Sequence, residues 1–132
     1  MKKSILLDSC VVIQCINGYD SPAKWLARAE TVYFSPVVLA ECLSGLRDTK
    51  TDKARRQTLE KMLGMSMAAR PPITEETARC YVRIWRQLSA VGNRIPTNDI
   101  WIAAHALELG ATLVTTDPHF RAIPLLDVLY AE

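Results

Sequence analysis

The apolar residues of this chain form short continuous runs that alternate with helical repeats. Four runs have the length of buried strands: residues 5–7, 32–34, 112–115 and 126–129. A weaker run at 65–69 predicts a further strand at the edge of a sheet. Strands that alternate with helices favour a parallel sheet covered by helices on both faces. The pattern therefore predicts a three-layer α/β/α domain with four or five mainly parallel strands, in a single domain over residues 1–132.

Helix signals separate these runs. Ser21-Pro22 and Ser35-Pro36 each place a capping hydroxyl before a proline, which predicts a helix start. A polar segment at 47–52 precedes a third helical stretch that stops at Gly64. The first helix is expected to run through about Glu30, and the second to continue to about Leu46.

The two C-terminal helices have different patterns. Thr74 is expected to cap a helix that stops at Gly92, and its apolar residues recur at helical spacing to form one face: Ala78, Tyr81, Val82, Trp85, Leu88 and Val91. Residues 100–109 follow Thr97 or Asn98 as a cap, end at Gly110 and are apolar on nearly every side. A helix of that kind is buried, so we expect it to lie against the sheet.

Composition and charge exclude several classes of protein. The 132 residues are 49% hydrophobic and 23% charged, which is ordinary for a globular domain. The net charge of +2 is too small to predict a polyanionic partner, and the basic residues between Arg47 and Lys61 fit a solvated helix face best. Asp8 interrupts the apolar run that follows Met1-Lys2-Lys3, so neither a signal peptide nor a membrane span is expected.

The four cysteines have no spacing typical of a metal site. They predict reduced, inert thiols and a cytosolic protein. The two histidines do not predict a catalytic centre either. His105 lies in mid-helix and is expected to be packed, whereas His119 fits a loop histidine close to the substrate.

Two predicted strands end at an aspartate. Asp8 follows the first strand, and Asp117 follows the strand at 112–115. Sites in open parallel sheets form outside the carboxyl ends of the strands, so the two carboxylates meet if these strands are neighbours. Thr115 would then project on the same side as Asp117. Ser9, Ser35 and Thr115 are hydroxyls that could orient a carboxylate or a metal-bound water.

Asp99 and Glu41 are less distinctive. Asp99 lies in the first turn of the buried helix, where the helix dipole alone favours an acid. Glu41 adjoins the apolar face of the helix after Ser35, where most carboxylates reach water; a functional role would bring it to the same crevice as Asp8. The other ten acids are interpreted as solvated charge: Asp20, Glu30, Asp48, Asp52, Glu60, Glu75, Glu76, Glu108, Asp127 and Glu132.

Carboxylates gathered at one place repel each other and raise one another's pKa. A hard divalent cation with oxygen ligands removes that conflict. Such a cation can activate water and orient a phosphodiester. The pattern therefore favours Mg²⁺ or Mn²⁺ over zinc, for which no Cys/His set is present.

Four segments resemble the motifs of PIN-domain nucleases, in particular the VapC-like toxins of bacterial toxin–antitoxin pairs. They are Leu6-Leu7-Asp8-Ser9, the segment from Ser35 to Glu41, the segment from Asn98 to Ala104, and Thr115-Thr116-Asp117-Pro118-His119-Phe120. The resemblance implies that Asp8, Glu41, Asp99 and Asp117 form an acidic metal site in a PIN-type fold. It also implies an RNA substrate, a small antitoxin as partner and a homodimer. Cys10 and Thr116 depart from the family pattern, in which asparagine is usual at the first position and frequent at the second.

Our hypothesis is hydrolysis of RNA by a metal-activated water. Asp8 and Asp99 would be the principal ligands, Asp117 would complete or support them, and Glu41 would position water or a second ion. One alternative is a phosphotransferase that uses Asp8 as nucleophile, although Cys10 stands where such enzymes have a second aspartate. Others are a housekeeping PIN nuclease in RNA processing, and a catalytically weak RNA-binding or antitoxin-titrating module of the same fold.

Overall fold

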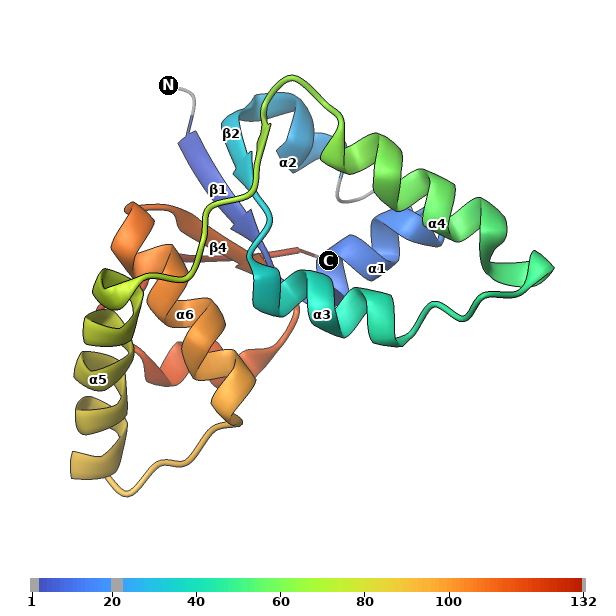
Figure 1. Cartoon of the computed structure of the whole chain (residues 1–132). Coiled ribbons are helices and arrows are strands. Elements are labelled where there is room, and N and C mark those ends of the chain that lie inside the picture. Colours follow the sequence, from blue (N-terminus) through green and yellow to red (C-terminus); the bar gives the residue numbers. More distant parts are fainter. Residues whose placement is uncertain (1–2, 20–22, 132) are drawn as a thin grey trace.

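The computed structural model describes residues 3–19 and 23–131, and its centre is a five-stranded sheet (Figure 1). The strands are β1 (Lys3–Leu7), β2 (Ala29–Tyr33), β3 (Ala68–Ala69), β4 (Thr112–Thr115) and β5 (Val128–Tyr130). They lie in the order β3-β2-β1-β4-β5, and every neighbouring pair is parallel. The predicted parallel α/β architecture is confirmed, with the short β3 at one edge.

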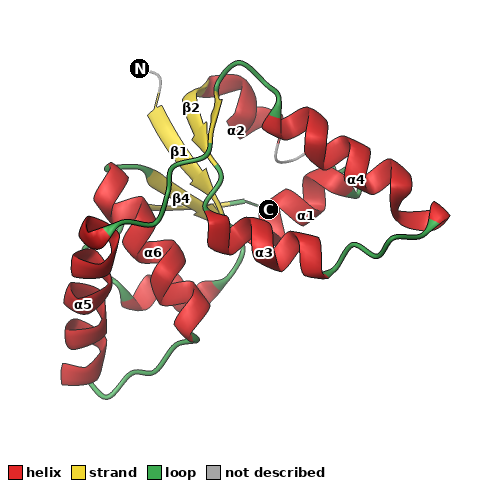
Figure 2. Ribbon diagram, viewed as in Figure 1, coloured by secondary structure: helices red, strands yellow, loops and turns green. Residues whose placement is uncertain are grey.

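Helices cover both faces of this sheet (Figure 2). The α-helices are α1 (Ser9–Ile16), α2 (Ala23–Arg28), α3 (Pro36–Ser44), α4 (Lys50–Leu63), α5 (Glu75–Ala90) and α6 (Thr97–Leu109), and a 3₁₀ turn, η1, spans Pro118–Ala122. Helices α5 and α6 pack on each other on one side, and α1 and α4 lie on the other. Helix α3 contacts both α1 and α6, near the carboxyl ends of the strands.

The two central strands are buried on both faces. Leu6, Leu7, Leu113 and Val114 expose no surface, as expected for parallel strands covered by helices. Each such side chain contributes about 1.5–3 kcal/mol on burial. The carboxyl ends of β1 and β4 are therefore held in a rigid, close-packed frame.

Several local signals act as predicted. Ser35 Oγ accepts a hydrogen bond from the Val37 amide at 3.3 Å, and Thr74 forms a capping box with Thr77 at the start of α5. Helix α6 ends at Gly110, whose φ of +62° lies in the left-handed region that favours glycine. The Ser21-Pro22 signal lies outside the described residues.

Other boundaries differ from the predictions. Helix α2 ends at Arg28, and Glu30, expected to be helical, lies in β2. Pro96 is the N-cap residue of α6, without a side-chain capping bond, so the prediction of Thr97 or Asn98 as cap is wrong. Strand β3 covers only two residues of the expected run, and β5 begins at Val128 rather than at residue 126.

Helix α1 was not predicted at all. Its N-cap is Asp8, whose side chain accepts from the Ser9 amide. Asp8 directly follows β1, so it is the one residue between this strand and α1. Aspartate is also a common helix-capping residue, but Asp8 was interpreted from sequence as a site acid at the end of a strand and was not considered as a cap.

The predicted buried face of α5 is largely wrong. The buried residues of this helix are Thr77, Cys80, Ile84 and Leu88. Trp85 is 51% exposed and Val82 is 40% exposed. The helix carries two adjacent apolar stripes, and packing against α6 buries the one that contains Ile84. The other stripe remains on the surface.

In the two described stretches of the chain, no helix has both the length and the apolar character needed to cross a membrane.

Candidate active site

Strands β1 and β4 are neighbours, so their carboxyl ends meet. Leu7 pairs with Val114, and the Asp8 amide donates to the Val114 carbonyl at 2.9 Å. The chain proceeds from β1 to β2 on one side and reaches β4 on the other side. This is the topological switch point at which open α/β sheets form their sites. The condition set in the sequence analysis for a meeting of Asp8 and Asp117 is therefore met.

Asp8 is almost fully buried and its two carboxylate oxygens are engaged. One oxygen, Oδ1, accepts from the Ser9 amide at 2.8 Å. The other, Oδ2, accepts from the Thr115 hydroxyl at 2.6 Å and from the Cys10 thiol at 3.5 Å. Asp8 is 4% exposed. Burial and three donors fix the orientation of this carboxylate, and the predicted orienting role of Thr115 agrees with the geometry.

Thr115 and Cys10 also tie Asp8 to the segment after β4. Thr115 Oγ1 accepts from the Asp117 amide at 3.0 Å, and Cys10 Sγ accepts from the Thr116 amide at 3.5 Å. Cys10 stands where the family resemblance led us to expect asparagine. Its thiol keeps a contact with the carboxylate, but a thiol is a weaker donor than an amide.

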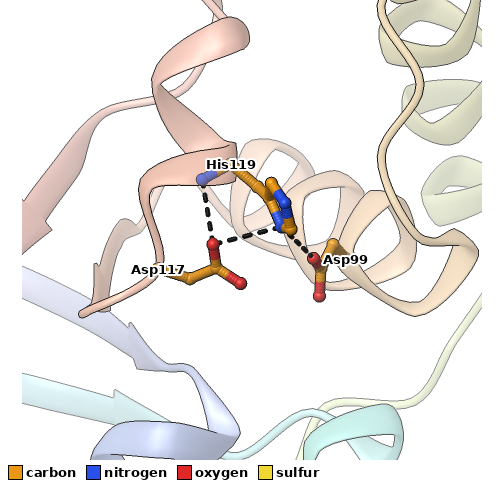
Figure 3. Close-up of side chains that lie close together, drawn as sticks. All are labelled: Asp99, Asp117 and His119. Atoms are coloured by element: carbon orange, nitrogen blue, oxygen red, sulfur yellow. Dashed lines mark hydrogen bonds and ion pairs between the residues drawn. The ribbon is translucent and has the colours of Figure 1, made fainter.

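Asp99, Asp117 and His119 form a close cluster (Figure 3). Asp99 comes from the first turn of α6, and Asp117 is the N-cap residue of η1, where its Oδ1 accepts from the His119 amide at 2.9 Å. His119 Nδ1 lies 3.1 Å from Asp117 Oδ1 and 3.4 Å from Asp99 Oδ2. His119, interpreted from sequence as a loop residue, thus lies between the two carboxylates.

The electrostatics link all four predicted acids. Burial, then the charges of Asp8 and Asp117, raise the pKa of Asp99 to about 6. Glu41 acts in the same direction, and the hydrogen bond from His119 acts against it. This direction is the one expected where several acids lie in the same part of a structure.

Glu41 reaches this site from α3. Its Oε1 is buried and has no hydrogen-bond partner among the described residues. Burial, followed by the charges of Glu41 and Asp8, raises the pKa of the Cys42 thiol to about 12. A buried carboxylate oxygen without a donor is costly, and such an atom in a native structure calls for a missing partner.

Some of these side chains lie close enough together to bind one metal ion. Within the described stretches, Asp99, Asp117 and His119 are the one group of three whose ligand atoms all lie within 4.8 Å of one another. Asp8 and Glu41 do not belong to that group. Asp8 is linked to Asp117 through Thr115 Oγ1, and both Asp8 and Glu41 act on Asp99 through their charge. The structure thus brings two predicted acids into direct proximity and places beside them His119, which the sequence analysis had near the site as a loop histidine.

A buried pair fixes the helices that carry Glu41 and Asp99. The Ser35 hydroxyl and His105 Nδ1 are 2.9 Å apart, between the start of α3 and the middle of α6. His105 is packed as predicted, and burial lowers its pKa. Ser35 was expected to orient a carboxylate or a water; it instead contacts His105, so that prediction is wrong.

Six of the acids interpreted as solvated charge have contacts. Asp48, Glu75 and Glu76 form ion pairs at the surface, and three others accept hydrogen bonds. Glu108 accepts from the Thr77 hydroxyl at 2.5 Å, and Asp127 accepts from the Thr112 hydroxyl at 2.6 Å. Asp52 accepts from the Arg47 amide, which lowers the pKa of this carboxyl. Asp20 and Glu132 lie outside the described residues.

Comparison with known proteins gives a consistent result. A family model described as the PIN domain matches residues 5–126. The chain is 31% identical over 129 residues to ribonuclease VapC2 of Rickettsia felis, which covers 92% of each protein. It is also 31% identical to ribonuclease VapC5 of Mycobacterium tuberculosis, covering 89% of this chain and 86% of that protein. Among solved structures, a chain of VapBC2 from Rickettsia felis bound to a promoter DNA fragment superposes with a TM-score of 0.85 and 28% identity, covering 98% of this chain and 99% of the other.

Proposed function

This chain belongs to the PIN-domain family, and from that premise we propose that it is a metal-dependent ribonuclease, the toxin of a toxin–antitoxin pair. The observation that carries the proposal is the close pair of Asp99 and Asp117, with Asp8 near enough for its charge to act on Asp99, at the switch point between β1 and β4. Two relatives with 31% identity across most of their length are named ribonucleases. The predicted reaction is hydrolysis of a phosphodiester bond in RNA.

The residues at this end of the sheet fit a hard divalent cation, Mg²⁺ or Mn²⁺. The donors are carboxylate oxygens, the ligands that such ions prefer. The raised pKa of Asp99 and the unpartnered oxygen of Glu41 both indicate negative charge that a cation would balance. We assign Asp8 and Asp99 as principal ligands, Asp117 as completing the set, and Glu41 as the group that positions water or holds a second ion. When bound, the cation supplies an activated water and neutralises charge on the phosphate.

The protein's own contribution is to hold these groups in place. Thr115 and the Ser9 amide orient Asp8, and the short turn after Asp117 orients that carboxylate through the His119 amide. Positioning of this kind lowers the barrier because the reacting groups need not be ordered at the moment of reaction. His119 is the most exposed member of the cluster, and we assign it to contact with the substrate phosphate.

One residue weighs against the first alternative. Such phosphotransferases place a second aspartate two residues after the nucleophile, and this chain has Cys10 there. Cys10 offers Asp8 Oδ2 only a weak thiol donor, at 3.5 Å. A covalent phosphoaspartate is therefore not expected.

The partner follows from similar complexes. Solved structures similar to this chain include toxin–antitoxin complexes named VapBC, one of them bound to a promoter DNA fragment. We propose that this chain likewise binds a small antitoxin and assembles as a homodimer in the cytoplasm. Co-expression with a small neighbouring open reading frame, followed by copurification, tests this part of the proposal.

The activity is tested by incubating the purified chain with total RNA in the presence of Mg²⁺ or Mn²⁺, then with EDTA. Cleavage should require the metal and should fall to background in Asp8→Asn and Asp99→Asn. Asp48→Asn is the matched control, because its side chain is fully exposed and pairs with Arg56 rather than with a residue of the site. Cleavage that persists unchanged in both site variants would refute the assignment. Metal binding without cleavage of any RNA would favour the RNA-binding module instead.

A further inference from the structure

A second feature lies beside the acidic site, between the end of α5 and the start of α6. Here the structure has a pocket of about 270 Å³. Its wall includes the aromatic rings of Tyr81 and Trp85, and its rim includes Ser89, Asn93, Arg94 and Thr97. The volume lies just below the roughly 300 Å³ at which pockets for complete small-molecule ligands begin. It therefore suits a single planar ring system.

We propose that this pocket binds one nucleobase of the RNA strand whose backbone reaches the acidic site. The proposal rests on the function proposed above and names a recognition subsite for it. Every base has a flat face that stacks on an aromatic side chain. Hydroxyl, amide and guanidinium groups at the rim can bond to the edge of a base.

The aromatic wall is accessible and rigid. Trp85 is 51% exposed although its indole is large and apolar. Tyr81 is backed by Trp101, with ring centroids 4.4 Å apart, so its ring cannot collapse into the pocket without losing that contact. An aromatic surface that is left open and supported from behind is prepared for stacking at little entropic cost.

The pocket and the acids share the first turn of α6. Thr97 and Ile100 line the pocket, and Asp99 lies between them in sequence. Successive helical residues turn by about 100°, so Asp99 projects to a different side of the same turn. The two features are thus separated by about the 10 Å diameter of a helix. A short stretch of single strand can span that distance.

Positive charge on α5 supports a nucleic acid as the occupant. Arg79, Arg83 and Arg86 line a shallow groove on the adjacent face of this helix. Arg79 pairs with Glu75 and Glu76, whereas in the described stretches Arg83, Arg86 and Arg94 have no ion-pair partner. Unpaired arginines next to an aromatic pocket can hold the phosphates of a strand while its base enters the pocket.

Binding is tested first without any need for cleavage. The full-length ¹⁵N-labelled chain in EDTA is titrated with nucleoside monophosphates at millimolar concentration. The three tryptophan indole resonances are followed, with Trp85 identified by Trp85→Phe. We expect a saturable shift of the Trp85 resonance and none of the Trp25 resonance. Absence of any shift with all four nucleotides would overturn the proposal.

Kinetics provide the second test. Trp85→Leu should raise KM for RNA by about five- to hundredfold, the effect of losing one base stack, with kcat little changed. Arg94→Gln should also raise KM. Trp85→Phe keeps an aromatic ring, so its KM should stay much closer to the wild-type value than that of Trp85→Leu. Lys53→Gln is the matched control, since Lys53 is exposed and lies on α4, on the opposite side of the sheet from α5. The Phe variant also separates loss of stacking from a failure to fold.

The outcomes distinguish this proposal from the proposed function. If the chain cleaves no RNA but nucleotides shift Trp85, the pocket stands and the ribonuclease function fails. If RNA is cleaved with an unchanged KM in Trp85→Leu and no nucleotide shift is seen, the pocket fails and the function stands. If light scattering shows a dimer that Trp85→Leu converts to a monomer, again without a nucleotide shift, the pocket is an interface between copies and the proposal is overturned.

Discussion

Replacing Asp99 with asparagine should stabilise the metal-free protein at neutral pH, although the same change should abolish cleavage. Asp99 has 14% of its side chain exposed. Its carboxylate faces three other acids, Asp8, Asp117 and Glu41, and His119 is the group that opposes them. Asparagine has nearly the same shape and carries no charge. The substitution therefore removes the repulsion and the cost of burying a charge while leaving the packing of α6 intact.

The size of the stabilisation expected for Asp99→Asn follows from the raised pKa of Asp99. Burial and the neighbouring acids raise the pKa of Asp99 from 3.8 to about 6. As the pH rises through this window, the unfolded chain loses its proton first, so the folded state becomes less stable and the full penalty is present above pH 6. The shift corresponds to about 3 kcal/mol at about 1.4 kcal/mol per pKa unit. Loss of a favourable charge in the first turn of a helix offsets up to about 1 kcal/mol, leaving a net gain of about 2 kcal/mol for the variant.

Urea unfolding in EDTA, followed by tryptophan fluorescence, measures this difference. Wild type and Asp99→Asn should have similar stability near pH 4 and should diverge as the pH approaches 7.5, with the variant more stable. Asp48→Asn, with a fully exposed carboxylate that pairs only with Arg56, should stay within about 0.5 kcal/mol of wild type throughout. Added Mg²⁺ or Mn²⁺ should stabilise wild type more than the variant. A variant no more stable than wild type at neutral pH would refute the idea that crowded acids destabilise the metal-free site.

Three further substitutions test the supports of the site. Thr115→Val removes the 2.6 Å hydrogen bond to Asp8 and should lower kcat and metal affinity, whereas Thr115→Ser should retain both. Cleavage assays measure kcat, and titration calorimetry measures metal affinity. Cys10→Asn replaces a weak thiol donor by an amide and should raise metal affinity a fewfold by calorimetry, so a loss of affinity would contradict the assigned contact. Ser35→Ala leaves His105 Nδ1 buried without a partner and also removes the cap of α3. The two losses together should cost about 2–4 kcal/mol in thermal or urea unfolding. A neutral result for Ser35→Ala would show that this pair does not hold α3 against α6.

Features that depend on neighbours along the chain were predictable. The apolar runs at residues 5–7 and 112–115 form strands because their length and composition suit a doubly covered sheet. The Ser35 cap and the turn at Gly110 act as expected, since capping and left-handed geometry are local properties. Asp8 and Asp117 could be placed at strand ends from the same information.

Features that depend on contacts between distant segments of the chain could not be predicted from the sequence. Ser35 was expected to orient a carboxylate, but its hydroxyl meets His105, which lies 70 positions away. The predicted face of α5 includes Trp85, which is half exposed, because both stripes of that helix have the right spacing and only the position of α6 selects one. His119 belongs to the cluster because η1 folds back from Asp117 toward the start of α6.

One part of the acidic site could likewise be predicted from the sequence, and the other part could not. The sequence alone determined that Asp8 and Asp117 end strands, that Asp99 begins a helix, and, through the family resemblance, that Glu41 accompanies them. Only the tertiary structure decided that β1 and β4 are neighbours and that the start of α6 reaches them. Periodicity and capping are set within a few residues of chain, whereas the order of strands in a sheet is set by which apolar faces bury each other across the whole domain.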